Sequence, residues 1–411
     1  MAQRRAVFRD AQGMRTLFVH ERVGPYGGAE ANISLSANEL KRRGHTVGLI
    51  HGPLRGKNEG EWNELFSARY PMGHKPDRAT VQAALWDFQP DIIYLHKMSD
   101  LEVLHGLSAS GTPVVRMIHD HDLYCMRGCK YFYFTRKICK RPLSAYCVFP
   151  CGGFLRKAGG WRFRWVSYLA KKKELRLNRH FQRLIVATQY MKDELLVNGF
   201  SSSRIQILPP VTHYSDPGLR SSFSSRNLVL YVGQIIRGKG VDVLLESLAQ
   251  VTSPFMCLIF GDGNHRSYCE KLSRKLGLQD KVIFKGFVSQ EELKAYYQEC
   301  SAVVMSSVWP EPFGAAGLEG MRYGLPVVAF DAGGIREWLT DGYNGFLVPW
   351  MDRTAFAARV QQLLAHKDQA QEMGERGRQM VAEEHDLNRY VELLDQTFQE
   401  VLAETREKAV V

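Results

Sequence analysis

The sequence predicts an α/β protein with two Rossmann-like, doubly wound domains that face each other across a cleft. Its 411 residues exceed what one hydrophobic core usually organises, and roughly 150 residues per domain suggest two large domains. Short apolar runs alternate with helical patterns through both halves of the chain, which is typical of parallel βαβ units. A polar break near the middle separates the two series.

The first series of elements predicts an N-terminal domain over residues 1–212. Its candidate strands are residues 16–20, 46–51, 91–96, 114–119, 183–188 and 205–208. Between the first two strands, Gly27-Gly28 precedes a helical pattern of apolar residues that ends at Arg43-Gly44. A glycine directly after the last periodic residue is typical of a helix C-cap, so we expect a helix there.

The second series predicts a second domain over residues 227–387. Pro209-Pro210 and the serine-rich residues 215–225 interrupt the alternation, which places a linker at residues 213–226. The alternation then resumes, with candidate strands at residues 228–232, 255–260, 281–284, 302–306 and 326–330. In doubly wound sheets, ligands bind beyond the carboxyl ends of the strands, so the loops at those ends are the candidate sites.

Composition and hydropathy restrict where the protein works. Hydrophobic residues make up 45% of the chain and charged residues 24%, which is ordinary for a globular protein. The first hydrophobic run, at residues 17–19, is too short for the core of a secretory signal, and no run of about 18 apolar residues is present. We therefore expect a cytoplasmic protein whose contact with the inner face of a membrane would be peripheral.

The sharpest chemical signal is the run E-P-F-G-A-A-G-L-E, from Glu311 to Glu319. It follows a candidate strand and opens a helix of small residues. About two helical turns separate its two carboxylates, so both can reach one elongated ligand. The free amides of residues 314–316 would point at an anionic or hydroxyl-rich group. The alternative interpretation is a solvated, capped helix.

The run G-Q-I-I-R-G-K-G, from Gly233 to Gly240, lies between another candidate strand and a helix. Arg237 offers a bidentate fork and Lys239 a point charge, and this pair suits a diphosphate. The run nearly matches a Walker A loop, but Gly240 stands where Ser or Thr would bind magnesium, so we reject a nucleoside triphosphatase. The alternative is a plain strand-to-helix turn with surface charges.

Three further motifs are weaker. The glycine loops Gly27-Gly28 and Gly261-Asp262-Gly263 do not fit the dinucleotide fingerprint, which tells against a dehydrogenase. The run His119-Asp120-His121-Asp122 ends the fourth candidate strand, where side chains lie over the cleft and can contact a ligand. Asp-His pairs also ligate metals or cap turns, so His119 is the preferred candidate functional residue and the other three rank below it.

Taken together, these motifs resemble the large family of retaining glycosyltransferases with the GT-B fold, often called family four or glycosyl transferases group 1. The resemblance covers roughly residues 14–400 and rests on the two glycine loops, Arg237 with Lys239, Gly286-Phe287-Val288, and the Glu-x7-Glu run. It implies transfer of a sugar from a nucleotide diphosphate donor with retention at the anomeric carbon. It also implies that the helical pattern of residues 388–411, from about Asn388 to Arg406, returns to the N-terminal domain.

The resemblance also assigns roles in the site. Arg237 and Lys239 would neutralise the donor diphosphate, Glu311 would bind hydroxyls of the donor sugar, and Glu319 would hold the ribose. His119 would lie against the sugar. The other donor-binding residues implied are Gly28, Gly233, Gly261, Phe287, Val288, Phe313, Gly314 and Ala315. Such enzymes usually need no divalent metal and no cofactor, because fixed cations stabilise the leaving group.

The acceptor and the membrane are less well indicated. The expected acceptor is a glycan or lipid-linked molecule in cell-surface polysaccharide assembly. Between Phe154 and Arg183 there are ten Lys or Arg and a single acidic residue, in a chain of net charge +11. This stretch places Trp161, Trp165, Tyr168 and Leu169 at helical spacing beside Arg162, Arg164 and the lysines 171–173, which predicts a helix in the headgroup region of an anionic membrane. Alternatively, those aromatic side chains pack into the core.

Other functions stay open as alternatives. A phosphorylase or an epimerase could use the same fold. The positive charge also fits a non-catalytic binder of anionic surfaces or nucleic acid, but the sequence shows no nucleic-acid motif, so no nucleic-acid partner is expected.

Five of the eight cysteines fall within residues 125–151. Cys125, Cys139, Cys147 and Cys151 resemble a cysteine-bearing loop of some relatives in the same family, and four thiolates can close a tetrahedral zinc site. Their spacings are longer than in a paired Cys-x2-Cys ribbon. A reduced, packed loop or a disulfide is the alternative, and disulfides are disfavoured in a chain without an export signal.

Overall fold

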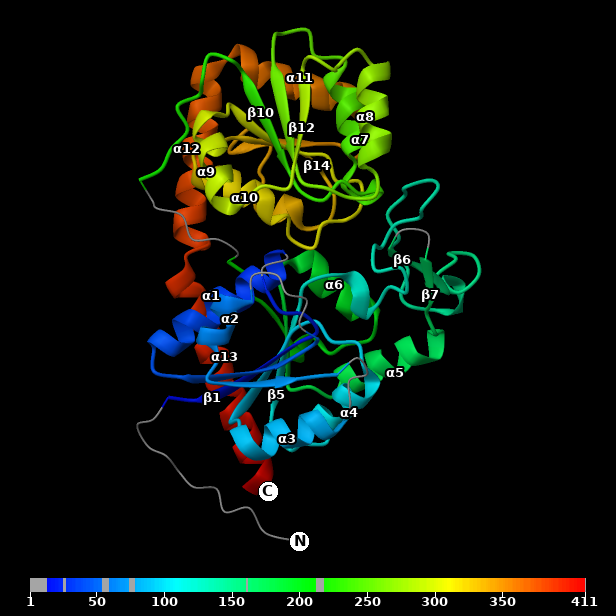
Figure 1. Cartoon of the computed structure of the whole chain (residues 1–411), viewed down its shortest axis with the longest axis vertical. Helices are drawn as coiled ribbons and strands as arrows, with labels where there is room; N and C mark the ends of the chain where they lie inside the picture. Colours follow the sequence, from blue (N-terminus) through cyan, green and yellow to red (C-terminus); the bar gives the residue numbers. More distant parts are fainter. Residues whose placement is uncertain are drawn as a thin grey trace.

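The computed structural model of the chain describes residues 13–24, 27–53, 59–73, 78–159, 162–211 and 218–410. Figure 1 shows two α/β domains stacked along the long axis, with the last helices running from the second domain back beside the first. The two doubly wound domains expected from the sequence are confirmed. No helix among these residues is both long and apolar enough to cross a bilayer.

The first domain is a parallel sheet of seven strands in the order β3-β2-β1-β4-β5-β8-β9. The strands are β1 (Arg15–His20), β2 (Thr46–His51), β3 (Ala68–Pro71), β4 (Ile92–Leu95), β5 (Val114–Ile118), β8 (Arg183–Val186) and β9 (Ile205–Ile207). The helices are α1 (Gly28–Arg42), α2 (Gly60–Leu65), α3 (Arg78–Phe88), α4 (Leu101–Ser108), α5 (Tyr168–Asn178) and α6 (Gln189–Val197). The central strands are buried throughout because helices cover both faces of the sheet.

The second domain repeats this plan with six parallel strands in the order β12-β11-β10-β13-β14-β15. The strands are β10 (Leu228–Val232), β11 (Met256–Phe260), β12 (Val282–Gly286), β13 (Ala302–Met305), β14 (Val327–Phe330) and β15 (Gly345–Val348). The helices are α7 (Val241–Leu248), α8 (Arg266–Lys275), α9 (Gln290–Glu299), α10 (Ala315–Arg322), α11 (Arg353–Ala365) and α12 (Lys367–Glu384). The strand order reverses at β10 and β13, which is where doubly wound sheets bind ligands.

Two edge strands were not expected from the sequence. In β3, half-buried and exposed residues alternate, so its short stretch lacks the apolar run that marks the central strands. β15 is only four residues long and follows a turn. Short strands at the edge of a sheet have weak sequence signals because one side needs no partner strand.

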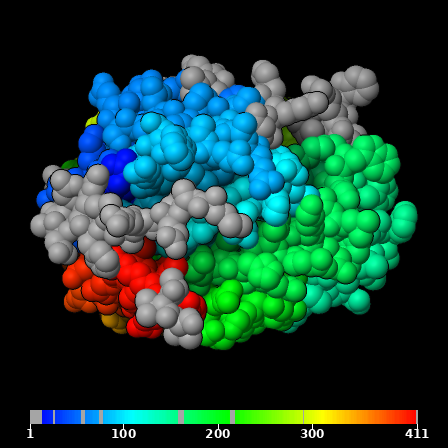
Figure 2. Space-filling model, turned by 90° about the horizontal axis from the view of Figure 1, so that it is seen from below, coloured from blue at the N-terminus to red at the C-terminus, as the bar shows by residue number. Residues whose placement is uncertain are grey.

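The C-terminal helix α13 (Leu387–Val410) packs against the first domain. Tyr390, Leu394 and Phe398 are buried in the same core cluster as residues of β1 and α1. In Figure 2, viewed from below, the red end of the chain lies beside green residues of the first domain. Arg183, at the start of β8, forms an ion pair with Glu404 of α13 at 2.6 Å.

Residues 119–167, which we call the inserted segment, separate β5 from α5. They contain two 3-10 turns, η1 (His121–Leu123) and η2 (Ala145–Cys147), and an antiparallel hairpin of β6 (Leu155–Gly159) and β7 (Arg162–Trp165). The prediction of a helix that carries Trp165 is therefore wrong, because Trp165 ends a strand and the helix begins only at Tyr168. Trp161 lies outside the described residues. Glycine pairs at residues 152–153 and 159–160 flank β6, which is a hairpin pattern rather than a helical one.

Candidate functional site between the domains

Glu311 lies buried in the loop that follows β13, with 3% of its surface exposed. Its amide donates to the carbonyl of Ala332 at 3.0 Å, and its own carbonyl accepts from the amide of Gly334 at 2.7 Å. These two backbone bonds fix the loop to the segment after β14. The carboxylate therefore has a set position at the carboxyl edge of the sheet.

Lys239, from the motif at residues 233–240, contacts this carboxylate. Its Nζ lies 2.7 Å from Oε1 of Glu311, and the Ser307 hydroxyl donates to the same oxygen. Burial alone would raise the pKa of Glu311, but the Lys239 charge and these hydrogen bonds outweigh burial and lower that pKa below its ordinary value. Glu311 is therefore held as an anion beside a fixed cation. The ring of Trp309 lies 5.1 Å from the same ammonium group.

Glycines allow the loops around this pair to approach so closely. Gly240 has φ +66° at the start of α7, and a Cβ there would lie 2.0 Å from the carbonyl oxygen of Ser306. Gly261 has φ +123°, and its Cβ would lie 2.0 Å from the carbonyl oxygen of Gly233. In the sequence, Gly240 is notable only because Ser or Thr would bind magnesium at that position of a Walker A loop. In the structure, a glycine is required there because the backbone is left-handed and closely packed.

Sequence reasoning missed two first-domain side chains that hold the Glu311 loop. The Nε2 of His121 lies 2.8 Å from the carbonyl oxygen of Pro310, and because a carbonyl only accepts, this nitrogen carries the hydrogen. The Thr188 hydroxyl donates to the carbonyl of Pro312 at 2.8 Å. His121 belongs to the His-Asp-His-Asp run, so the sequence did contain a signal for it. Thr188 has no such signal apart from its position at the end of β8.

His119 lies at the end of β5 in a group of histidines. Its Nε2 is 2.8 Å from Nδ1 of His96, and burial lowers the pKa of His119 to about 4. Beyond them, Nε2 of His20 lies 3.2 Å from the Glu30 carboxylate on the first turn of α1. His119 is therefore neutral at physiological pH and serves as a hydrogen-bonding group rather than a cation. Gly28, where α1 begins, is exposed two residues before this glutamate.

Arg237 does not share the partner of Lys239. Its Nε donates to the carbonyl of Tyr133 at 3.2 Å, and its guanidinium lies 5.0 Å from the centre of the Tyr133 ring. The two cations stand at the two ends of η4 (Arg237–Lys239). Arg237 is thus directed to the inserted segment, and Lys239 to Glu311.

The predicted residues of the α10 region are placed in different ways. Gly314 caps α10 with φ +88°, and the helix begins at Ala315. Phe313 is buried, and its carbonyl accepts from the indole of Trp338 at 2.6 Å. The side chain of Phe313 therefore belongs to the core, which leaves the start of α10 to offer backbone groups.

The residues predicted to hold the nucleoside lie farther along the same sheet edge. Glu319 accepts a hydrogen bond from the Tyr297 hydroxyl at 3.3 Å. Phe287, after β12, is 84% exposed, and the neighbouring Val288 is half-buried. An exposed aromatic ring in a loop at the carboxyl edge of a sheet is well placed to stack on a base.

The clustered cysteines are free thiols, and four of them line one small cavity, namely Cys125, Cys139, Cys147 and Cys151. Within the described residues, however, no three His, Cys, Asp or Glu side chains gather as a metal ion requires. The Cys129 thiol instead donates to the carbonyl of Tyr131 at 3.9 Å. This geometry does not support the zinc site that the sequence offered as one possibility, and the zinc site stays an untested prediction.

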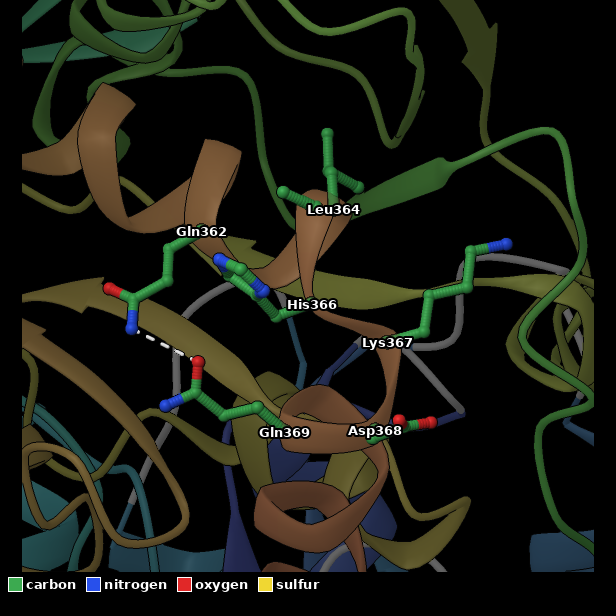
Figure 3. Close-up of a pocket in the computed structure, with 7 residues that line it drawn as sticks. Gln362, Leu364, His366, Lys367, Asp368 and Gln369 are labelled. Atoms are coloured by element: carbon green, nitrogen blue, oxygen red, sulfur yellow. Dashed lines mark hydrogen bonds between the residues drawn. The ribbon is translucent and has the colours of Figure 1, made fainter.

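A separate pocket lies where α11 meets α12 (Figure 3). Gln362 and Gln369 face each other there and share a hydrogen bond of 3.0 Å. His366, Lys367 and Asp368 line the rest, at the junction of the two helices. None of the predicted site residues lines this pocket, so it is separate from the candidate donor site.

Comparisons with known proteins agree with this architecture. The family model described as "Glycosyltransferase Family 4" matches residues 26–213, and the one described as "Glycosyl transferases group 1" matches residues 220–380. Among solved structures, Anabaena HepE in complex with UDP and glucose has a TM-score of 0.71 at 18% identity, over 94% of this chain and 100% of that one. Sucrose-phosphate synthase from Thermosynechococcus elongatus has a TM-score of 0.73 at 18% identity, over 95% and 100%.

Curated relatives match over shorter stretches. Alpha-D-kanosaminyltransferase of Streptomyces kanamyceticus is 33% identical over 172 residues, which are 41% of this chain and 44% of that protein. The lipopolysaccharide core biosynthesis glycosyltransferase LpsE of Rhizobium meliloti is 31% identical over 150 residues, or 36% and 43% of the two chains. The chain thus spans less than half the length of these two relatives.

Proposed function

Since the chain belongs to the glycosyl transferases group 1 family, with a GT-B fold, we propose that it is a retaining glycosyltransferase. It moves a sugar from a nucleotide diphosphate donor to a glycan or lipid-linked acceptor. The observation that carries the proposal is the contact of Lys239 with Glu311 at 2.7 Å. Two motifs 72 positions apart in sequence supply one cation and one buried carboxylate to the same edge of the sheet.

The cations act on the donor diphosphate. Lys239 has three N–H donors and uses one on Glu311, so the others are available for phosphate oxygens. Arg237 adds a planar fork at the other end of η4. Positive charge fixed in advance stabilises the nucleoside diphosphate as it departs, and it does so without a divalent metal.

The remaining groups orient the sugar. Glu311 is an anion whose carboxylate accepts hydrogen bonds from donor hydroxyls, and within the described residues no side chain caps the amides at the start of α10. His119 approaches from the first domain as a neutral imidazole, which can bind a hydroxyl without repelling the cationic side chains. Retention through a front-face reaction fits this set, because an oxygen of the leaving diphosphate can take the acceptor proton.

The acceptor belongs to the first domain in this proposal. A named relative acts in lipopolysaccharide core biosynthesis, and solved structures of the same fold hold UDP or UDP-glucose. We infer that the acceptor is a glycan or glycolipid of a cell-surface polysaccharide. A lipid-linked acceptor would require the enzyme to work at the membrane surface.

Ligand-dependent melting tests the donor site. Nucleoside diphosphates are added one at a time, and a ligand at 100 times its Kd should stabilise the fold by about 2.7 kcal/mol. The shift should be lost in Lys239→Ala and retained in Lys294→Ala. The control is matched, because Lys294 pairs with Glu291 at the same 2.7 Å but on the surface. If no nucleoside diphosphate raises the melting temperature, the proposal is contradicted.

Product analysis separates the remaining alternatives. The donor is incubated with water, with orthophosphate or with a panel of glycan acceptors, in the presence and absence of EDTA. A glycosyltransferase gives a new glycoside only with an acceptor, and NMR of its anomeric proton should show the configuration of the donor. A sugar phosphate would identify a phosphorylase, and an altered donor sugar an epimerase. Loss of activity in EDTA would overturn the metal-independent proposal alone.

A further inference from the structure

Large apolar side chains are exposed together on the outside of the inserted segment. Phe149 is 80% exposed, Trp165 is 76% exposed and Leu169, in the first turn of α5, is 74% exposed. Phe154 joins the first two, since its ring centre lies 5.8 Å from that of Phe149 and 5.6 Å from that of Trp165. We call Phe149, Phe154 and Trp165 the aromatic cluster. Burial in the protein core, the alternative left open by the sequence, does not apply to Trp165 and Leu169, whereas Tyr168 is half-buried.

The charge of the same region is one-sided. From Leu123 to Lys173 there are thirteen Lys or Arg and no Asp or Glu, in a chain of net charge +11. Some of these cations are used inside the protein, because buried or half-buried carboxylates pair with them. They are Lys130 with Glu194, Arg136 with Asp242, Arg156 with Asp122, and Lys171 with Glu174.

Six of the other cations face solvent. The exposed cations are Lys137, Lys140, Arg141, Arg164, Lys172 and Lys173, and no ion pair within the described part of the chain involves them. The sequence grouped three consecutive lysines as membrane contacts, but Lys171 is 9% exposed and also donates to the carbonyl of Asp122 at 2.7 Å. The lysines available to a partner are therefore Lys172 and Lys173, with Arg164 next to the aromatic cluster in β7.

We propose that this flank of the first domain docks on an anionic bilayer, with the aromatic cluster at the depth of the headgroups. The Trp165 ring gains from that depth because its apolar body leaves water while its indole N–H stays hydrated, and the two Phe rings add apolar area. The surrounding cations meet acidic phospholipid headgroups, and attraction of this kind grows with each basic residue near the surface. Figure 1 shows β6, β7 and the start of α5 projecting at one side of the molecule, where a flat surface can reach them.

The same segment is tied to the donor site. Arg136 pairs with Asp242 on α7, and the Tyr133 carbonyl accepts from Arg237. A bilayer that holds the aromatic cluster therefore also sets the distance of the domain interface from the lipid. The use of this geometry rests on the proposed function, because docking would present a lipid-linked acceptor to the first domain.

Vesicle co-sedimentation of the full chain tests the surface without donor or acceptor. Vesicles of phosphatidylcholine with phosphatidylglycerol are compared with vesicles of phosphatidylcholine alone, at low and high salt. We expect binding to the anionic vesicles that weakens with salt. Reversing three cations, Arg164→Glu with Lys172→Glu and Lys173→Glu, should weaken it on the order of a hundredfold. Phe149→Ala with Trp165→Ala should weaken it about tenfold.

Matched controls exist elsewhere on the chain. Trp86 on α3 is 79% exposed, so Trp86→Ala removes an equally exposed indole away from the inserted segment. Lys271, Arg274 and Lys275 are exposed on α8, and reversing them makes the same charge change in the second domain. Both control proteins should bind vesicles like the wild type. Nucleotide-dependent melting, which reports the donor site, should be unchanged in all four variants.

Three results would overturn the proposal. Equal sedimentation of the wild type and the test variants would show that this surface does not bind the bilayer. An equally large loss in the control variants would show that only the net charge of the protein drives binding. Duplex DNA that displaces the protein from vesicles, with the aromatic variant binding DNA like the wild type, would assign the surface to nucleic acid. In each case retained nucleotide-dependent melting would leave the glycosyltransferase proposal intact, so the two failures are distinguishable.

Discussion

The Glu311 loop and the inserted segment both follow the carboxyl end of a buried parallel strand, but different forces hold them. Backbone hydrogen bonds and close glycine contacts fix the loop after β13, where an added Cβ at Gly240 would lie 2.0 Å from a carbonyl oxygen. Side-chain ion pairs fix the inserted segment after β5, as between Lys130 and Glu194 at 2.8 Å. The first arrangement leaves no freedom at the carboxylate, and the second leaves an outer surface free to meet a partner.

The difference predicts how substitutions divide between the two regions. Changes in the Glu311 loop should act on the chemistry, because the reacting groups are positioned there. Changes in the inserted segment after His121 should act on stability, on donor affinity or on surface binding. A variant in one region that shows the effect expected of the other region would contradict this division.

The largest expected effect is on catalysis. Glu311→Gln keeps the shape of the side chain but removes the charge beside Lys239, so transfer should fall on the order of a hundredfold or more. Steady-state kinetics and melting are measured for this variant and for Glu291→Gln, which removes the carboxylate of the exposed pair with Lys294. The control should keep wild-type activity. Near-normal transfer by a folded Glu311→Gln protein would show that the carboxylate has no part in the reaction.

The next effect is on stability, in the contact between the inserted segment and α7. Asp242 is buried with Arg136 and His265, and its pKa is about 2, because the hydrogen bonds and charges of those two partners outweigh the effect of burial. Asp242→Asn leaves a buried guanidinium without its anion, which should lower the free energy of unfolding by about 3 kcal/mol. Urea denaturation measures this change.

A surface pair provides the control for that measurement. Arg226 and Glu299 lie 2.6 Å apart with both side chains largely exposed, so Glu299→Gln should cost less than about 1 kcal/mol. Equal losses in the two variants would mean that burial adds nothing to the inserted segment's ion pair. The inserted segment would then be held by some other contact.

The sequence predicted the parts of the molecule that follow regular periodicity. Buried apolar runs such as β4 and β10 mark their own positions, and the ends of parallel strands placed Lys239 and Glu311 at one edge. It could not predict that His121 would reach the carbonyl of Pro310, because that contact depends on how two domains meet. Within the inserted segment, aromatic spacing favoured a helix, and only the glycine pairs indicated the hairpin.

A smaller effect concerns pH and compares one histidine of each domain. Burial lowers the pKa of both His119 and His385 to about 4, while an unfolded histidine titrates near 6.5. Between these values the unfolded chain binds more protons, so stability is fully present above about pH 6.5 and falls as the pH drops toward about 4. His119→Gln and His385→Gln should each remove about 1 to 2 kcal/mol of that dependence, seen in melting from pH 8 to 5.

Activity then separates the two histidines. Only His119→Gln should reduce transfer at pH 8, since His385 packs against the ring of Phe313 in the second domain's interior. If both variants keep full activity, His119 is a structural residue like its counterpart. If neither changes the pH dependence of melting, the imidazoles are not held neutral in the way that their burial indicates.

The smallest expected effect lies where the two regions touch. Arg237 stacks on the ring of Tyr133 at 5.0 Å and donates to its carbonyl, so the inserted segment orients a cation of the donor site. A cation–π contact at a partly exposed position contributes about 0.5 to 1 kcal/mol. Tyr133→Leu removes the ring and leaves the carbonyl, so the KM for the donor should rise about two- to fivefold with kcat unchanged. Tyr133→Phe keeps the ring and should match the wild type. A lower KM in Tyr133→Leu would instead mean that the tyrosine holds the arginine away from the diphosphate, and the inserted segment would then restrain the donor site rather than prepare it.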